Sequence, residues 1–555
     1  MNQLWQFIRE LRRRQVFRVA AIYLVGVWVV LQVADLAFES FDVPGQALRY
    51  MWIGAFIGFP LALILGWKYD ITANGIVRTP VVDSELPSDL SLKRVDYIIL
   101  AGLSIVVGII TFGLAQEILG TRDITPTTIQ VTNVPENSIA VFPFENLSAD
   151  PDNEYFSKGM TAELISRLSR IQKLQVVSYF QTKEDINKIG QKLKARYSLE
   201  GTVRRSGSRI RITALLIDTS TGFNLWSENF DGELQDVFDL QEQTALKIAD
   251  ALDIHLSPEE SQAIARHDTE NLEAYDAFLR GWTIIESFHY RSDNFESRLS
   301  TARKHFQQAL EFDPNYSLAV AGLSMVESLY VFYGSKSPSE QLLLAHAFAT
   351  EALALDTNLP EPHLALGLAF GVGGDYVRAV DEFRESVSLD TQNGYSWCYL
   401  AWAYNGLQPP SATEAEKASR DAIRLTPAYF WAYVLLGDAL RFQEHSADAI
   451  SAYEYALILN PDYKSAYVEI GRIYFKQGNY HQALAAFNKA EQTPDVLVGI
   501  SRTHLALGDI QKGLERLEEA LANGYSDFIT IETSPDFASL ADDTRFQQLL
   551  EQYRK

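Results

Sequence analysis

The sequence predicts a multidomain chain with three transmembrane α-helices, a small α/β domain and then an all-α solenoid. Three observations predict this order: long uncharged apolar runs confined to the first 116 residues, a mixed strand and helix pattern after a polar linker, and a repeating helical period in the second half. The expected boundaries are 1–120 for the membrane domain, 121–136 for the linker, 137–256 for the α/β domain, and 257–555 for the solenoid with its carboxyl-terminal cap.

The three apolar runs cover about residues 16–37, 50–67 and 97–116. Each has nearly the length that an α-helix needs to cross a hydrocarbon core about 30 Å thick. In lipid the backbone must satisfy its own hydrogen bonds, which predicts helices for all three runs. Two alternatives remain. The first run could be a cleaved signal peptide, although it lacks an A-x-A-like site, and the third could be a buried helix of a soluble domain.

The distribution of basic residues predicts the orientation of these spans. Arginines precede the first run, and Lys68, Arg78, Lys93 and Arg94 lie between the second and third runs. Positive residues remain on the cytoplasmic side of a membrane. We therefore expect a cytoplasmic amino terminus, with everything after Gln116 on the opposite side.

Net charge and cysteine content exclude several kinds of partner. Residues 1–120 contain ten Lys/Arg and ten Asp/Glu, so the formal net charge of −23 belongs entirely to the rest of the chain. A strongly acidic surface repels phosphates, which argues against nucleic acid as a partner. Cys398 is the single cysteine, so neither an intramolecular disulfide nor a cysteine-based metal site can form.

The segment after the linker alternates between strand and helix patterns. Helices are expected where apolar residues recur at helical spacing, and strands where short apolar or alternating runs end in turn residues. The expected strands are 138–143, 174–177, 197–205, 210–218 and 223–228, and the expected helices are 155–171, 183–195 and 236–252.

Two long stretches carry a resemblance to a known domain. SIAVFPFENLSADPDNEYFSKGMTAELISRLSRIQKLQVVS and YSLEGTVRRSGSRIRITALLIDTSTGFNLWSENFD resemble the TolB amino-terminal-like domain, a small α/β domain of bacterial envelope proteins. The resemblance covers about residues 137–256. RRRQVFRVAAIYLVGVWVVLQVAD, followed by GFPLALILGWKYDIT, resembles the amino-terminal module of bacterial membrane-anchored repeat proteins. Together they imply a bacterial inner-membrane protein with periplasmic soluble domains, and they imply no catalytic residue.

The second half repeats a helix–turn–helix unit. Residues next to a helix-breaking proline, or its equivalent, recur at spacings of 43, 34, 36, 34 and 33, and these are Asp313, Asp356, Asp390, Thr426, Asn460 and Thr493. Small residues that allow close helix packing recur in the first helix of each unit at Gly367, Ala401, Gly437 and Gly471. This period resembles the tetratricopeptide repeat (TPR), and six to seven repeats are expected. After Thr493 we expect a shortened first helix, then a degenerate pair and a cap.

A TPR array implies a protein-binding groove lined by its first helices. The groove candidates are Tyr395, Trp402, Asn405, Trp431, Asp438, Arg441 and Arg472. Aromatic side chains beside Asn and Arg suit a peptide ligand. The alternative is that Trp402 and Trp431 are ordinary packing residues between repeats, and that Asp438 and Arg441 form a solvated pair.

Signatures of catalysis and of metal binding are missing from the sequence. It contains no HExxH, no G-x-S-x-G and no G-x-x-x-x-G-K-[ST] motif. We therefore predict that the chain is not an enzyme and has neither cofactor nor metal. Gly371–Gly374 is expected to be an inter-helix turn rather than a phosphate loop. Arg204 and Arg205 are expected either at an exposed hairpin end or in a docking contact.

The sequence thus predicts a membrane-anchored scaffold that presents a TolB-like domain and a TPR groove to protein or peptide partners in the cell envelope. The alternative is a signalling or transport-associated regulatory subunit that relays partner binding across the inner membrane. The spans carry no charged residue near their centres, which argues against an ion path. A hydrolase hidden in the α/β domain would require a nucleophile–base pair that the sequence does not suggest.

Overall fold

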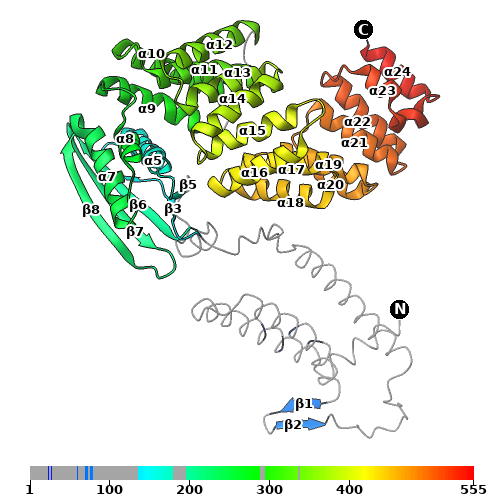
Figure 1. The fold of residues 1–555 in the computed structure, drawn as a ribbon. Helices are drawn as coiled ribbons and strands as arrows, with labels where there is room; N and C mark the ends of the chain where they lie inside the picture. Colours follow the sequence, from blue (N-terminus) through cyan, green and yellow to red (C-terminus); the bar gives the residue numbers. More distant parts are fainter. Residues whose placement is uncertain are drawn as a thin grey trace. The chain divides into compact units, whose positions relative to one another are not determined.

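The computed structural model describes residues 135–178, 195–287, 294–334 and 338–554, together with two short strands and four single residues nearer the amino terminus. The chain divides into two compact units, Met1–Asp123 and Ile124–Lys555. Each unit is described by itself below, and Figure 1 shows the elements with their labels.

The described part of the first unit is small. Strands β1 (Tyr69–Thr72) and β2 (Gly75–Arg78) form an antiparallel hairpin. The Tyr23 hydroxyl donates to the carbonyl of Ala55 at 2.7 Å, and the Tyr23 ring lies 5.9 Å from that of Phe59. At this point the first two predicted apolar runs are therefore in contact.

The predicted spans 16–37, 50–67 and 97–116 lie outside the described residues, except for the single residues of the first two runs. Within the part of the chain that the structure describes, no helix combines the length and the apolar character that crossing a bilayer requires. The membrane anchor remains a prediction.

The second unit begins with a mixed sheet in the order β5–β3–β6–β7–β8, with β4 paired to β6. Strands β3 and β5 run parallel to each other, β3 runs parallel to β6, and β6, β7 and β8 form an antiparallel meander. The strands are β3 (Ser138–Val141), β4 (Glu145–Asn146), β5 (Gln175–Ser178), β6 (Tyr197–Ser206), β7 (Arg209–Asp218) and β8 (Asn224–Glu233).

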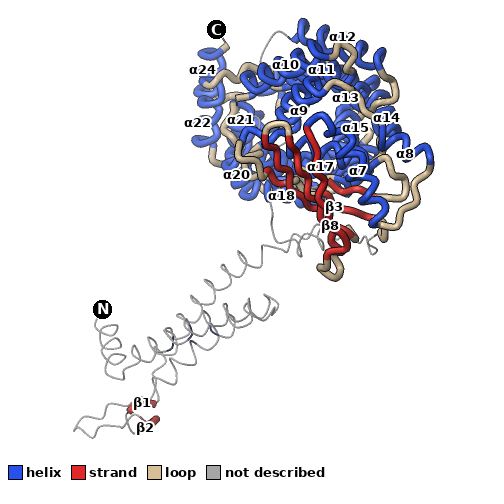
Figure 2. The backbone as a smooth tube through the Cα atoms, turned by 90° about the vertical axis from the view of Figure 1, so that its left-hand side faces the viewer, coloured by secondary structure: helices blue, strands red, loops and turns tan. Residues whose placement is uncertain are grey.

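Helices α5 (Glu154–Ser169), α7 (Val237–Ala251) and α8 (Pro258–Ala265) accompany this sheet. Along β7 the even-numbered residues from Ile210 to Asp218 are buried, because they face the helix layer, while the odd-numbered ones are less buried. Figure 2 shows the strands beside α7. The α/β prediction is confirmed except for the helix expected at 183–195, which lies almost entirely outside the described residues.

Fourteen helices of the described chain, α9 to α22, follow as seven consecutive contacting pairs, α9 with α10 through α21 with α22. Figure 1 shows successive pairs side by side. The first helices are α9 (Leu272–Ser287), α11 (Ser317–Phe332), α13 (Pro360–Val372), α15 (Gly394–Gly406), α17 (Phe430–Phe442), α19 (Ser465–Lys476) and α21 (Pro494–Ala506). The second helices are α10 (Phe295–Phe312), α12 (Pro338–Leu355), α14 (Tyr376–Leu389), α16 (Ala412–Leu425), α18 (Ser446–Leu459), α20 (Tyr480–Lys489) and α22 (Ile510–Ala522).

The small residues of the first helices have the role that the period predicts. A Cβ added at Gly367 would lie 2.6 Å from the ring of Phe383, and one added at Gly437 would lie 2.6 Å from the ring of Tyr453. Both rings belong to the second helix of the same pair and are fully buried. Truncating such a ring to alanine typically costs about 3–5 kcal/mol. A glycine facing a buried aromatic ring thus fixes the distance between the two helices of a repeat.

One repeat departs from the expectation. Helix α21 has 13 residues, whereas the second helix before it, α20, has only 10. The prediction of a shortened first helix after Thr493 is therefore wrong, because the missing residues come from the end of the preceding repeat. Thr493 itself caps α21, with its hydroxyl accepting from the amide of Val496. The array ends in α23 (Phe528–Thr533), a short 3₁₀ helix (Pro535–Leu540) and α24 (Thr544–Tyr553), which pack on α21 and α22 in a separate apolar cluster.

The α/β domain and the solenoid share one apolar core. In α5, a Cβ at Gly159 would meet the Leu279 side chain of α9 at 2.7 Å. The carboxylate of Asp276 in α9 accepts from the Tyr155 hydroxyl at 2.6 Å and pairs with Arg205 of β6 at 3.0 Å. Arg205 is therefore a docking residue, which confirms that alternative, whereas Arg204 is exposed.

A second contact joins the sheet edge to the loop before α15. The Gln392 side-chain oxygen accepts from the amide of Val176 at 2.6 Å, and its side-chain nitrogen donates to the carbonyl of Leu174 at 2.6 Å. The side chain thus pairs with the outer edge of β5 as a neighbouring strand would.

Candidate protein-binding surface

Two tryptophans from consecutive first helices meet. Trp402 of α15 and Trp431 of α17 have ring centres 6.4 Å apart, and both are partly exposed. Tyr399 packs edge-on against Trp431 at 5.4 Å, and Tyr376 packs edge-on against Trp402 at 5.5 Å. Phe332 of α11, whose exposed fraction is 48%, lies 6.2 Å from Trp402. We call these five residues the aromatic cluster.

The contact between Phe332 and Trp402 spans three repeats because of one glycine. Phe332 and Trp402 belong to first helices that are separated by α13. A Cβ at Gly371 of α13 would overlap the six-membered ring of Trp402. The glycine therefore leaves room for Trp402 to lie across α13 and reach Phe332. Gly374, three residues later, has φ +85° at the inter-helix turn, as expected of a turn glycine.

Tyr395 and Asn405 connect α15 to its neighbour. The Tyr395 ring packs edge-on against Tyr429 at 5.2 Å. Asn405 donates from its side-chain nitrogen to the carbonyl of Leu435 in α17 at 3.0 Å, while its buried side-chain oxygen accepts no hydrogen bond from the described residues. Asn405 thus positions α15 against α17 and retains an unused acceptor.

Charged residues of α17 and α19 form a second group. Arg441 lies 3.4 Å from Glu469 and 3.6 Å from Asp438, and Arg472 pairs with Glu469 at 2.6 Å. We call Asp438, Arg441, Glu469 and Arg472 the charged network. Tyr453 donates its hydroxyl to Asp438 at 2.7 Å. Burial raises the pKa of Asp438, although the Tyr453 hydrogen bond and Arg441 oppose this rise.

The expectation of a solvated Asp438–Arg441 pair is therefore wrong. Only 25% of the Asp438 side chain is exposed, and its carboxylate joins α17 to α18 through Tyr453. Charges that are paired internally have less to offer a ligand, since a partner must compete with existing ion pairs. Arg472, with 59% of its side chain exposed, is the member of the charged network most open to a partner.

The sequence predicted five of the nine residues in these two groups and missed the other four. Phe332, Tyr376 and Tyr399 complete the aromatic cluster, and Glu469 links the two arginines. Phe332 gave a signal, because it ends a first helix whose other residues are mostly buried. Glu469 gave none, since its role depends on how α17 and α19 pack.

The described residues contain no group of three or more His, Cys, Asp and Glu side chains arranged to hold a metal ion. Cys398 is buried, and its burial raises the pKa of the thiol. The absence of a catalytic role and of a cofactor stays a prediction.

The helix pairs and the partly exposed aromatic cluster define the class of this part of the chain: it is an array of tetratricopeptide repeats. The tetratricopeptide repeat family model matches residues 434–496, from within α17 to the start of α21. TPR arrays are in general scaffolds for interactions with proteins or peptides.

Two further comparisons concern the α/β domain and a part of the chain that makes up 44% of its length. The family model that matches residues 135–247 is described as the HilA/YgeH-like transcriptional regulator, second domain. The TolB-like resemblance of the same segment stays a prediction. A protein of Rhizobium meliloti (strain 1021) named "Putative adenylate cyclase 3" is 34% identical over 252 residues, which are 44% of this chain and 41% of the relative.

Other relatives are repeat proteins. Human tetratricopeptide repeat protein 6 is 26% identical over 207 residues, 36% of each chain. The chain spans less than half of the length of these two relatives. A tetratricopeptide repeat protein of Parabacteroides merdae has a solved structure similar to 47% of this chain and 96% of its own, with 14% identity and a TM-score of 0.34.

Proposed function

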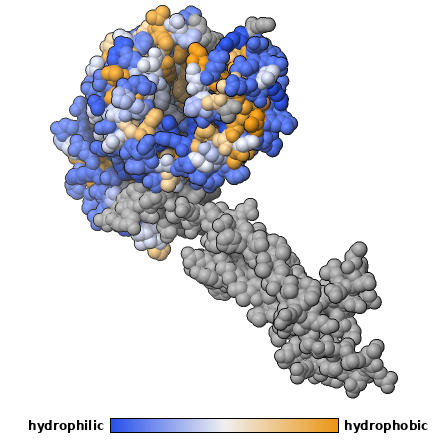
Figure 3. Space-filling view, turned by 90° about the vertical axis from the view of Figure 1, so that its right-hand side faces the viewer, coloured by the Kyte–Doolittle hydropathy of each residue, from blue (hydrophilic) through white to orange (hydrophobic). Residues whose placement is uncertain are grey.

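We propose that the chain is a membrane-anchored scaffold whose TPR array binds a protein or peptide partner through the aromatic cluster. The carrying observation is the Trp402–Trp431 contact, which places large, partly exposed rings from consecutive first helices on one continuous surface. Buried aromatic contacts dominate the binding free energy of many protein interfaces. Figure 3 shows that apolar residues form separate patches on one otherwise hydrophilic face of the protein.

Trp431→Ala tests this proposal, with Trp397→Ala as the matched control. Trp397, in α15, is partly buried as Trp431 is. Its ring nitrogen donates to the carbonyl of Thr391, away from the aromatic cluster. Partners crosslinked to the full chain in its membrane are identified, and the affinity of each is then measured for both variants. We expect Trp431→Ala to weaken binding about 30-fold, equivalent to about 2 kcal/mol.

Thermal unfolding of the same variants separates binding from packing. If Trp431 only packs between repeats, its truncation lowers the free energy of unfolding by roughly 3–5 kcal/mol, and the folded variant still binds normally. That result would end the assignment of Trp431 to the binding surface.

The location of the scaffold is part of the proposal: a bacterial inner membrane, with a cytoplasmic amino terminus and periplasmic α/β and TPR domains. Its support is the basic residues around the predicted spans. Alkaline phosphatase and a fluorescent protein, fused in turn after Lys555, report on the location of the carboxyl end. Fluorescence without phosphatase activity would reverse the topology.

A second candidate function is a signalling subunit that relays partner binding across the membrane. The similarity to a relative named as an adenylate cyclase supports it. Hydrogen exchange distinguishes the two candidates. A scaffold shows protection only around the aromatic cluster when a partner binds, whereas a relay also shows changes within residues 1–120. We propose no catalytic activity for either candidate, and turnover in a general hydrolase screen would contradict that.

A further inference from the structure

Strand β8 ends the described sheet on the side opposite β5. Among the described residues it pairs only with β7, along the register from Asn224 to Glu233. It has ten residues, as many as β7 beside it and β6 beyond. An edge strand of this length offers a row of backbone groups to another extended chain.

A hydrogen bond at the open end of the β7–β8 hairpin shows which backbone groups of β8 face away from β7. The amide of Leu234 donates to the carbonyl of Ser208. In an antiparallel pair, the backbone groups of alternate residues point to opposite sides. From Trp226 to Gly232 the even-numbered residues of β8 therefore bond to β7, and the amide and carbonyl groups of Ser227, Asn229 and Asp231 point away from it.

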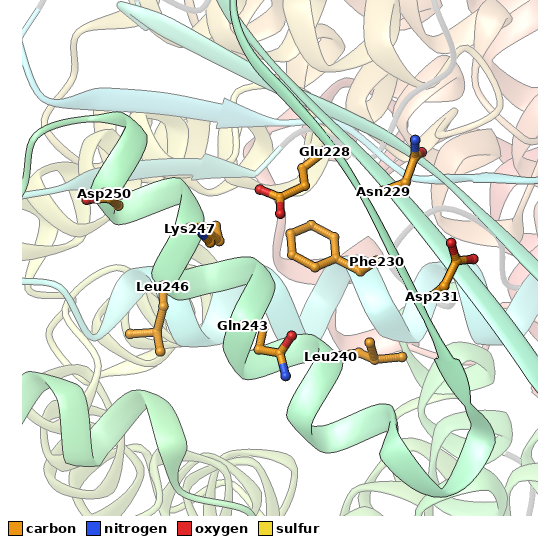
Figure 4. Close-up of a pocket in the computed structure, with 9 residues that line it drawn as sticks. All are labelled: Glu228, Asn229, Phe230, Asp231, Leu240, Gln243, Leu246, Lys247 and Asp250. Carbon is orange, nitrogen blue, oxygen red and sulfur yellow. The ribbon is translucent and has the colours of Figure 1, made fainter.

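A groove of about 530 Å³ lies beside this edge, between β8 and α7. Figure 4 shows Glu228 and Phe230 in the space between the strand and the helix. Phe230 and Leu240 are buried, and Leu246 is partly buried. A strand added to β8 would extend the sheet past α7 and place every second side chain in the groove.

The charges of the groove define the occupant. Its lining includes Glu228, Asp231 and Asp250 against the single cation Lys247. Asp231 pairs with Arg211 at 2.6 Å, whereas Glu228 and Asp250 have no ion pair within the described part of the chain. The groove thus favours basic side chains at every second position of an added strand.

A second copy of this chain is a poor occupant. Strand β8 (NLWSENFDGE) contains two glutamates and one aspartate but neither lysine nor arginine. Pairing it with another β8 would bring acidic strands together, and like charges on facing strands are destabilising.

We propose that the β8 edge and the β8–α7 groove bind an extended segment of another protein, by strand addition, and that this segment alternates basic and apolar residues. Main-chain hydrogen bonds to Ser227, Asn229 and Asp231 would supply the affinity, and the groove would supply selectivity for alternate side chains. This site is separate from the aromatic cluster.

The test uses the full chain in detergent and a fluorescein-labelled octapeptide that alternates lysine and valine. Fluorescence anisotropy measures its affinity against a peptide of the same composition with four lysines followed by four valines. We expect the alternating peptide to bind at least about tenfold more tightly, because only its side chains match the groove at strand spacing. Equal affinities would show that charge alone attracts the peptide and would overturn the proposal.

Backbone methylation of the peptide tests strand addition directly. N-methylation at all lysines or at all valines removes the amide donors of one peptide edge and leaves those of the other. One methylated peptide should lose binding about tenfold or more, while the other should retain it. Equal effects of the two methylations would overturn the proposal.

Asn229→Pro is the protein variant, with Asn229→Ala as its control. Proline removes the outward amide of the edge strand, whereas alanine keeps it, and both lose the hydrogen bond with Thr213. We expect Asn229→Pro to weaken peptide binding about tenfold and Asn229→Ala to leave it unchanged. Equal affinities of the two variants would overturn the proposal.

Two further results would decide the occupant. Glu228→Lys should weaken binding of the lysine–valine peptide and favour a glutamate–valine peptide instead. If the full chain self-associates through an interface that Asn229→Pro dissolves, the occupant is a second copy and the proposal is wrong.

Discussion

The ring of Trp402 occupies the space that a side chain at position 371 would fill. Gly371 lies on α13, and Trp402 lies on the next first helix, α15. Gly371 lies in the last turn of α13, which ends at Val372, and the lack of a side chain there lets the ring lie across the helix.

Gly371→Ala should therefore displace Trp402 and loosen its contact with Phe332. Overpacking of this kind typically costs about 1–3 kcal/mol of unfolding free energy. Tryptophan fluorescence should shift to longer wavelength as the ring becomes more exposed. In a Trp402→Ala background the same substitution has nothing to displace, so it should cost much less, and a double-mutant cycle measures the difference. Equal costs in both backgrounds would contradict the interpretation.

Asp276→Asn should weaken the contact between the α/β domain and the solenoid. Burial raises the pKa of Asp276, but hydrogen bonds from Tyr155 and Arg280 outweigh it and hold the pKa below its usual value. Loss of one partner from such a shielded ion pair costs about 3–5 kcal/mol when burial is complete, so we expect roughly 2 kcal/mol here. Chemical denaturation measures this loss, and Asp231→Asn, which removes the exposed pair with Arg211, should have little effect.

The same carboxylate predicts a response to acid. Because its folded pKa is below its unfolded value, the stabilisation is present above the unfolded pKa and is lost as pH falls through the folded pKa. The stability difference between Asp276→Asn and the unaltered protein should therefore shrink below about pH 4. A difference that is independent of pH would show that the charge of Asp276 is not what holds the domains together.

The pKa of Glu361 is shifted in the opposite direction from that of Asp276. Burial, followed by repulsion from Asp268, raises its pKa to about 8, and burial together with Glu163 raises the pKa of Asp268 to about 6. A carboxyl whose folded pKa is raised destabilises the fold as pH rises from its unfolded value towards the folded one. Arg170 opposes this repulsion, while Asp390 adds to it.

Glu361→Gln should accordingly stabilise the protein at pH 8 by roughly 1 kcal/mol or more and have little effect at pH 4. Thermal unfolding at both pH values measures the gain. Glu351→Gln is the control, since Glu351 is an exposed glutamate of the solenoid. A gain at pH 4 as large as that at pH 8 would exclude ionisation as its cause.

Glu444 occupies a turn position that neighbouring repeats fill with glycine. Its φ is +64°, and Gly374 and Gly478, in the corresponding turns, have φ of +85° and +76°. A left-handed backbone is unfavourable for a residue with a Cβ. Glu444→Gly should raise the unfolding midpoint, although it removes the exposed pair with Lys476. Glu444→Ala loses the same pair and keeps the strain, so it should not raise the midpoint.

Much of the fold follows from the sequence, for physical reasons that differ between its parts. The bounds of β6 and β7 agree with the predicted ones to within one residue. One buried face enforces an alternation of apolar and polar residues, which the sequence shows. Strand β8 extends five residues beyond its predicted end at Glu228, through a polar segment. This part of the edge strand β8 pairs with β7 although its sequence has no alternating apolar pattern from which a strand could be predicted.

The candidate surface was predicted only in part. The repeat register placed Trp402 and Trp431 on corresponding helices, and they do meet. It could not show that Phe332 reaches Trp402 across α13, because that contact depends on the size of a residue in another repeat. Nor could it show that Asp438 is shielded, since this requires the hydroxyl of Tyr453 from the second helix.

The side chain of Gln392 restricts strand pairing between the sheets of two molecules. If β8 of one molecule could pair with β5 of the next, each addition would create a new free edge and the chains would grow into an open filament. The amide of Val176 and the carbonyl of Leu174 are already bonded to Gln392, so β5 does not accept a strand until the solenoid releases it. Strand addition at β8, as proposed above, would therefore stop after one guest strand, and the chains would not grow through pairing of β8 with β5.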